Sequence, residues 1–157
     1  MPRHVAARSY FEHEKRAYAA LKAIQGKGID KCWGYFTCKF HARELADDRE
    51  VAVIVLDYWE GIRLTKVRVS KLSAEERQRF RREILGIINQ SFENDIFFPR
   101  ITEHIIWMSS DNKQARLRGL EYSYSPAEHG LGDEKKSQIA QQHVKRVERF
   151  LALYGFT

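Results

Sequence analysis

The chain has 157 residues, and its 27 lysines and arginines exceed its 21 aspartates and glutamates, which gives a formal net charge of +6. Hydrophobic residues make up 43% of the sequence, so a generally disordered chain is excluded, and the length fits one domain over residues 1–157. No run approaches the ~20 consecutive apolar residues that a membrane-spanning helix needs, which excludes a spanning protein and a membrane partner.

The cysteines and histidines predict neither a disulfide framework nor a metal site. Cys32 and Cys38 are the two cysteines, too few thiols for a disulfide scaffold or a zinc cluster. The six histidines show no spacing typical of metal ligands. Reduced thiols and an N-terminus without an apolar signal core indicate a cytoplasmic or nuclear protein.

The first predicted element is an amphipathic helix over residues 9–25. Ser9 is a candidate N-cap, and residues 26–28 (Gly-Lys-Gly) tolerate the left-handed backbone of a helix end. At ~100° per residue, one arc of this helix collects the apolar side chains Tyr10, Phe11, Ala17, Tyr18, Leu21 and Ile24. The arc predicts that one face of the helix is buried.

Two strands are predicted to follow this helix. Residues 33–40, which are rich in aromatic side chains, predict the first strand, and residues 43–50 predict a polar turn. Residues 51–58 (Val-Ala-Val-Ile-Val-Leu-Asp-Tyr) predict the second strand. A continuous β-branched run of this kind is typical of a buried strand.

A second helix is predicted over residues 74–89. Ser73 and Glu76 form a capping-box pattern at its start. Its apolar residues recur at helical spacing and are Phe80, Ile84, Ile87 and Ile88. The segments that follow are an apolar stretch at 96–98, an apolar run at 105–108, a turn at 109–113 and a short strand at 115–120.

The last predicted element is a helix over residues 133–153. Its apolar stripe consists of Ile139, Val144, Val147, Phe150 and Leu151. Such a stripe caps the core of its own chain or docks onto an exposed surface, and the sequence leaves both uses open. The mixture of helices and strands, without a repeat or a linker, predicts an α+β fold.

Glu14 is the one residue that does not fit a simple amphipathic helix, because it lies in the middle of the apolar arc. An unpaired buried carboxylate is costly, so this side chain must reach solvent, become neutral or meet a cation. Two interpretations stay open: a half-buried arc in which Glu14 bends out to water, and an ion pair across the fold.

Four segments resemble, in order, parts of the fungal-type protein-kinase-like domains. Residues 10–21 (Tyr-Phe-Glu-His-Glu-Lys-Arg-Ala-Tyr-Ala-Ala-Leu) are similar to the αC helix of that family. Residues 24–34 resemble the following turn and the start of the fourth strand, and residues 51–64 resemble the fifth strand and the hinge. The helix at 74–89 takes the place of αE. The resemblance implies a partial kinase-like fold that includes a remnant of the catalytic-loop region and a C-terminal helix.

In this family the αC glutamate, here Glu14, pairs with a lysine on the preceding strand. No lysine precedes the helix in this chain, so only Arg3 or Arg8 could replace it. The candidates for cofactor binding that the resemblance implies are Glu14 and, at the hinge where the adenine of ATP would form hydrogen bonds, Asp57, Trp59 and Glu60.

The positions that carry catalysis in the family are degenerate here. The His-Gly-Asp or His-Arg-Asp triplet falls on residues 98–100, so the general base is replaced by the guanidinium of Arg100, which cannot accept a proton. The metal-binding asparagine is replaced by Ile105, although Mg²⁺ requires oxygen ligands. The Asp-Phe-Gly triplet falls on Gly119, Leu120 and Glu121, with a carboxylate at the wrong place. We therefore expect no phosphotransfer, no catalytic residue, no metal and no cofactor.

The resemblance also implies a truncated domain that lacks the first three strands of the small lobe and the activation segment. The strands at 33–40 and 51–58 would then expose edges and an apolar face, which invite pairing with another chain. We expect a protein partner or self-association through this small-lobe surface. A relic of marginal stability is the other outcome.

The leading hypothesis is thus a degenerate protein-kinase-like domain without phosphotransferase activity that acts through protein binding. One alternative is a residual ATP- and Mg²⁺-dependent phosphotransferase that uses Asp95, Glu103 or Glu121 as its carboxylate. The other is a nucleic-acid-binding domain with two basic clusters: Arg77, Arg79, Arg81 and Arg82, and Lys135, Lys136, Lys145, Arg146 and Arg149. Acidic residues beside both clusters and the lack of an aromatic stacking platform argue against nucleic acid.

Overall fold

A computed structural model describes residues 3–40, 49–99 and 101–157. The fold is α+β, as predicted, with three α-helices and two small antiparallel sheets in the described residues. The helices are α1 (Arg3–Ala20), α2 (Ala74–Glu93) and α3 (Asp133–Leu153). The strands are β1 (Cys32–Phe40), β2 (Arg49–Leu56), β3 (Gly61–Arg63), β4 (Ile106–Ser109) and β5 (Ala115–Leu117). Short 3₁₀ helices are η1 (Lys22–Ile24), η2 (Leu64–Lys66), η3 (Val69–Lys71), η4 (Leu120–Tyr122) and η5 (Ala127–His129).

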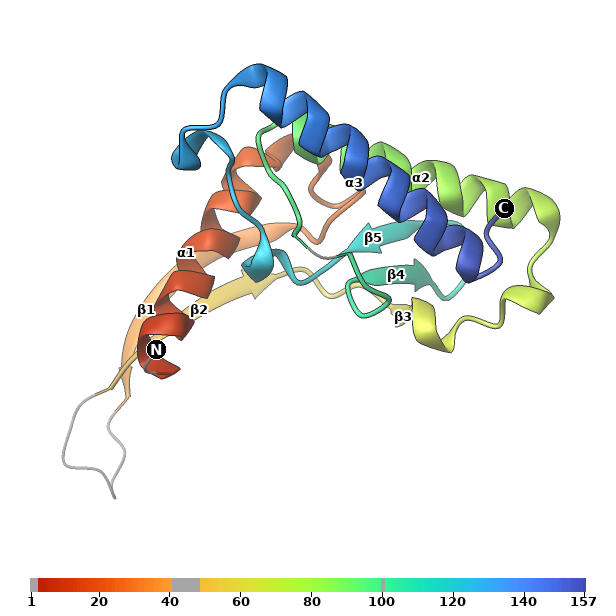
Figure 1. The fold of residues 1–157 in the computed structure, drawn as a ribbon. Coiled ribbons are helices and arrows are strands. Elements are labelled where there is room, and N and C mark those ends of the chain that lie inside the picture. The colour runs from red at the N-terminus through yellow and green to blue at the C-terminus, as the bar shows by residue number, and fades with distance from the viewer. Residues whose placement is uncertain (1–2, 41–48, 100) are drawn as a thin grey trace.

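The two sheets are covered by different helices. The first sheet is the hairpin β1–β2, and α1 lies along one of its faces (Figure 1). The second sheet has the order β3–β4–β5. The helices α2 and α3 run antiparallel, side by side, next to this sheet (Figure 1). The main core forms where α2, α3 and the second sheet meet the C-terminal part of α1.

Helix α1 begins earlier than predicted. It starts at Arg3, so Ser9 lies inside the helix and the prediction that Ser9 is the N-cap is wrong. The sequence before Ser9 contains two alanines and two arginines, which are strong helix formers and extend the helix backwards. The end is close to the prediction, because α1 stops at Ala20, η1 follows, and Gly26 adopts a left-handed φ of 76°.

Strand β2 corrects two predictions. It starts at Arg49, so the last two residues of the predicted polar turn are in the strand, while residues 43–48 lie outside the described residues. The strand is also not buried on both faces, because a helix covers only one side of a two-stranded sheet. The side chains of Val51, Val53 and Val55 are 36–41% exposed. The β-branched run indicated a strand correctly but not the burial of both faces.

The helices α2 and α3 match their predicted positions well. Ser73 caps α2 through a complete capping box with Glu76, and the four predicted core residues of α2 are buried. Helix α3 has the predicted bounds, with Val147 and Leu151 buried; Ile139, Val144 and Phe150 are only half-buried. The stripe of α3 therefore packs on its own chain. Beyond α3, the ring of Phe156 packs against Phe80 with centroids 4.7 Å apart.

The second sheet is shorter and more complex than predicted. Strand β5 ends at Leu117 instead of residue 120, and Gly119 turns the chain with a φ of 77° into η4. Strand β3 was not predicted, because a three-residue segment carries too little periodicity. It pairs with β4, where Ile62 lies opposite Met108.

Candidate functional site

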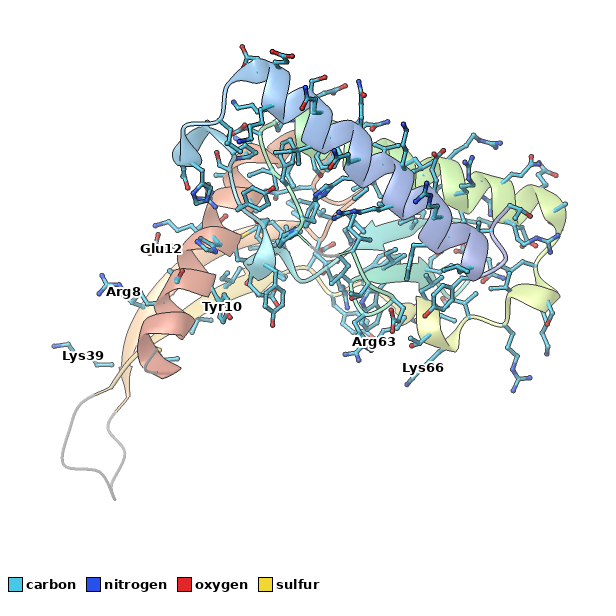
Figure 2. The ribbon with its side chains drawn as sticks, in the orientation of Figure 1. Arg8, Tyr10, Glu12, Lys39, Arg63 and Lys66 are labelled. Atoms are coloured by element: carbon cyan, nitrogen blue, oxygen red, sulfur yellow. The ribbon has the colours of Figure 1, made fainter. Side chains whose placement is uncertain are left out.

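Glu14 and Glu121 meet where α1 packs against η4. Glu14 is half-buried, and burial raises its pKa to about 7, with the negative charge of Glu121 as the second cause. The neighbour of Glu14 is thus a carboxylate and not the cation that an ion pair across the fold would require. Among the described side chains Glu14 has no ion-pair partner; Arg8 is exposed (Figure 2), and the side chain of Arg3 lies outside the described residues. The half-buried Glu14 carboxylate thus has a raised pKa instead of a cationic partner among the described side chains.

Two of the three degenerate positions lie in contact with each other. The Ile105 side chain lies 3.1 Å from the point where a Cβ on Gly119 would stand, and the Glu121 carboxylate lies 3.6 Å from the same point. The left-handed φ of Gly119 makes any larger residue strained there. Arg100 lies outside the described residues. The structure therefore brings Ile105, Gly119, Glu121 and Glu14 into one region.

A cavity of about 510 Å³ adjoins this region. Its lining is mostly apolar and consists of Phe98, Pro99, Thr102, His104, Ile105, Gly119 and Tyr122. The ring of Tyr122 packs edge-on against Tyr10 of α1, with centroids 5.4 Å apart. Ile105 and Gly119 offer no side-chain oxygen to a metal ion, whereas an Mg²⁺ ion bound to phosphate needs oxygen ligands.

The hinge candidates do not form a common binding site. The carboxylate of Asp57 accepts a hydrogen bond from the Lys31 amide at 2.5 Å and lies 3.3 Å from Arg116. The ring of Trp59 packs directly on Gly61, while the side chain of Glu60 is exposed. Asp57 and Trp59 thus serve contacts within the chain.

Sequence reasoning missed a buried ion-pair network around Asp30. The Asp30 carboxylate is 2% exposed and lies 3.1 Å from Arg116 Nη1 and 2.7 Å from Arg118 Nε. Arg116 also donates to the Gly26 carbonyl at 2.8 Å. The network joins the turn after η1 to strand β5 and to the segment after β2, so it fixes the two sheets relative to each other. The signal that could have found it is a pair of arginines two residues apart, with Arg116 inside the short apolar strand β5 and Arg118 directly after it.

The same arginines stack with two tryptophans in what we call the arginine–tryptophan ladder. The guanidinium of Arg116 lies 4.7 Å from the centroid of Trp59, and that of Arg118 lies 5.8 Å from Trp59 and 4.5 Å from Trp107. Arg63 completes the ladder at 5.4 Å from Trp107. Cation–π contacts of this kind are each worth about 0.5–2 kcal/mol. Two guanidinium groups of the ladder thus contact the Trp59 ring.

The outer surface of the hairpin is a second unusual region. Gly34, Phe36 and Cys38 of β1 lie opposite Val55, Val53 and Val51 of β2 in the register, so their side chains share one face, which we call the hairpin face. The other face carries Tyr35, Ile54 and Leu56, which pack toward α1 and the core. The ring of Phe36 lies over Gly34 and is 56% exposed. The six residues that define the hairpin face are uncharged, and the next pair on the same alternation is Phe40 and Arg49.

The basic clusters are partly used within the chain. Arg81 pairs with Glu148 at 2.7 Å, and Lys136 pairs with Asp95 at 3.1 Å. Arg77 and Arg79 donate to the backbone carbonyls of Leu72 and Asn112. These contacts join helices and loops, and they leave fewer cations for a phosphate backbone than the sequence indicated.

The carboxylates proposed for a residual phosphotransferase are not brought together. Asp95 follows α2 and accepts hydrogen bonds from Ser125 and from the amide of Ala127. Glu103 lies 3.7 Å from His104, and Glu121 lies beside Glu14. Within the described residues, no three His, Cys, Asp or Glu side chains are grouped closely enough to hold a metal ion.

Comparison with known proteins gives no relative on which to rest a function: no protein family and no curated protein matches the chain. None of the helices in the described part of the chain is both long and apolar enough to cross a membrane.

Proposed function

We propose that this chain is a non-catalytic, protein-kinase-like domain that acts by protein binding through its hairpin face. The observation that carries the proposal is the exposed apolar surface formed by Phe36 of β1 and the three valines of β2. The exposed parts of Phe36, the three valines and the neighbouring Trp33 amount to roughly 400 Å². Patches of ~300–600 Å² are the largest that typical monomers expose, and they are often functional.

The region that would hold the phosphates and metal in a kinase supports the non-catalytic part of the proposal. Glu14 has Glu121 beside it, so the αC glutamate would meet a like charge instead of a lysine. Ile105 and Gly119 supply no oxygen ligand. At the hinge, the Trp59 ring contacts the guanidinium groups of Arg116 and Arg118 and packs against Gly61, so part of the ring is already engaged where a planar base would stack.

We assign a second copy of the chain as the occupant of the hairpin face. A face made mainly of Phe36 and three valines offers little complementarity to an acidic or basic partner, but its apolar surface is complementary to itself. Two copies would bury roughly 800 Å² of this surface in addition to a polar rim, close to the ~1,000 Å² lower limit of a specific interface. We therefore expect a weak, concentration-dependent dimer.

Sedimentation velocity over a wide concentration range tests this function. The wild-type chain is expected to shift from monomer to dimer, and the double variant Phe36→Thr/Val53→Thr is expected to remain monomeric, because threonine keeps β propensity but removes apolar surface. Leu153→Gln is the matched control, since Leu153 is an exposed apolar residue at the end of α3. Two results would contradict the assignment. One is a wild-type chain that stays monomeric at every concentration, and the other is a Leu153→Gln control that loses the dimer as completely as the double variant.

A further inference from the structure

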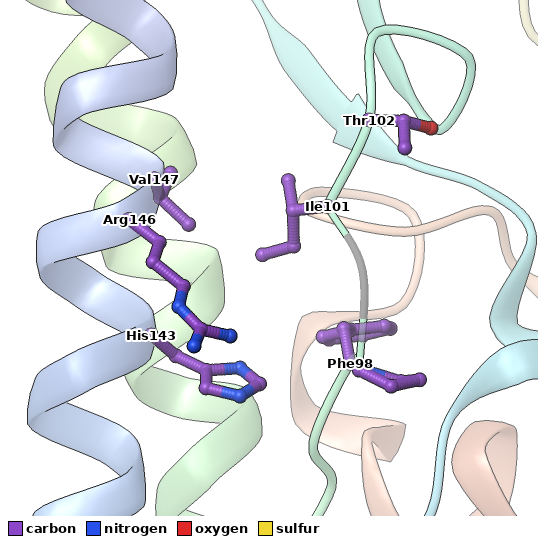
Figure 3. A pocket seen from close by; sticks show the side chains of 7 residues that line it. Phe98, Ile101, Thr102, His143, Arg146 and Val147 are labelled. Carbon is purple, nitrogen blue, oxygen red and sulfur yellow. The ribbon is translucent and has the colours of Figure 1, made fainter.

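A second cavity, of about 270 Å³, lies between α3 and the segment before β4. Figure 3 shows its two walls. Helix α3 supplies His143, Arg146 and Val147, and the segment opposite supplies Phe98, Ile101 and Thr102. The cavity shares Phe98 with the larger one described above but is distinct from the hairpin face. Nothing in the proposed function uses it.

His143 is a buried polar side chain in the wall of this cavity. The side chain is 9% exposed, and its ring packs edge-on against Phe92 and Phe97, with centroid distances of 5.7 and 6.1 Å. Burial lowers the pKa of His143, and the positive charge of Arg146 lowers it further, so the imidazole is neutral at pH 7. Neither ring nitrogen is among the fully buried, unpaired side-chain atoms of the described residues, so the imidazole is open to the cavity that it lines. A neutral imidazole keeps one N–H donor, which is available to a ligand in the cavity.

Arg146 stands one helical turn after His143 on the same face of α3. Its guanidinium lies beside the imidazole at the cavity (Figure 3). The ion pairs that α3 forms with α2 and with the turn after α2 use Glu148 and Lys136. Arg146 is not in an ion pair with any described residue. A guanidinium presents a planar fork of donors that matches a carboxylate.

The remaining walls of the cavity are apolar. Phe98 and Val147 are each 1% exposed, and the third apolar lining residue, Ile101, is half-buried. Binding sites for larger organic ligands have volumes of ~300–1,000 Å³, so this cavity fits a small molecule. A ligand that satisfies both kinds of wall combines an anionic group with a compact hydrocarbon body.

We propose that this cavity is a binding site for a small organic carboxylate. The carboxylate accepts hydrogen bonds from Arg146 and His143, and the hydrocarbon body packs against Phe98, Ile101 and Val147.

Titration of the isotope-labelled full chain with benzoate, followed by NMR, tests this site. The resonances of the Val147 methyl groups and the His143 ring are expected to shift with saturation. Arg146→Gln is expected to weaken benzoate binding at least about tenfold, which corresponds to about 1.4 kcal/mol. Arg149→Gln is the matched control, because it removes the same charge from an exposed position one turn further along α3.

Two further ligands decide which part of the proposal holds. Benzamide has the shape of benzoate without its charge and is expected to bind at least about tenfold more weakly, because it loses the charge-assisted hydrogen bonds. Inorganic phosphate lacks the hydrocarbon body and is expected to be weaker than benzoate as well. The proposal is overturned if benzoate causes no saturable shift or if Arg149→Gln weakens benzoate binding as much as Arg146→Gln does. It is also overturned if benzamide or phosphate binds as tightly as benzoate.

Discussion

The hairpin β1–β2 and the helix pair α2–α3 are both rich in apolar side chains, but the chain covers them to different extents. In α2, residues such as Phe80 and Ile84 are covered by α3 and by the second sheet, and they are at most 2% exposed. In the hairpin, α1 covers only one face, and Phe36 is left 56% exposed on the other. An apolar run thus predicts an element but not the number of its faces that are covered. The uncovered face is where we place the function.

The largest expected contrast comes from truncating one phenylalanine in each region. Phe80→Ala should lower the free energy of unfolding by about 3–5 kcal/mol, because it leaves a cavity beside Phe156 in the core. Phe36→Ala should lower it by less than about 1 kcal/mol for the monomer, because its ring is already largely in water. Urea denaturation at low protein concentration measures both values. Equal losses would mean that the hairpin face is covered in the folded chain.

The Asp30 network should give the next largest effect, because it joins the two regions. Asp30→Asn should cost about 3 kcal/mol, since it leaves Arg116 and Arg118 with less compensation in a buried setting. Asp57→Asn is the comparison, and its cost should be smaller because the Asp57 side chain is 25% exposed. Urea denaturation of both variants checks this order. A reversed order would show that Asp57 is the main partner of Arg116.

A smaller effect is expected from pH, through Glu14. Its pKa is about 7 in the folded chain against a usual value of 4.5, so the folded state holds a proton that the unfolded state has lost between these values. The stability contribution is therefore complete below about pH 4.5 and is lost as the pH rises through 7. Glu14→Gln should remove this loss and raise the melting temperature at pH 8 while leaving it little changed at pH 4.5.

The exposed Glu12→Gln variant is the control for that pH series, since it changes the same group on the same helix. It should leave the slope of stability against pH as in the wild-type chain. A Glu14→Gln variant that keeps the wild-type slope would show that another group, such as Glu121, controls this pH range.

The sequence predicted the long elements better than their surroundings. The capping box at Ser73 and the periodicity of α2 and α3 depend on neighbours within a turn or two of helix, so local patterns locate these helices closely. The start of α1 was predicted wrongly because a serine inside a helix carries the same local signal as one at its N-cap. Strand β3 was missed because its pairing with β4 joins segments more than forty residues apart.

The candidate site was predictable only in part. Glu14 stood out because a carboxylate interrupted an apolar arc, and the structure shows a half-buried group with a raised pKa there. Three features depend on contacts between distant segments: the approach of Glu121 to Glu14, the network around Asp30 and the cavity at His143. No pattern within a single element indicates which of these side chains meet.

A thermal melt with and without millimolar ATP and Mg²⁺ tests most directly whether the domain is non-catalytic. The account predicts one cooperative transition at the same temperature in both conditions, because Ile105 and Gly119 offer no metal ligand and the Trp59 ring is engaged by Arg116 and Arg118. A ligand present at ~100 times its dissociation constant stabilises the folded state by about 2.7 kcal/mol, which is readily visible as a shift. A clear upward shift that requires Mg²⁺ would contradict the account and favour a phosphotransferase.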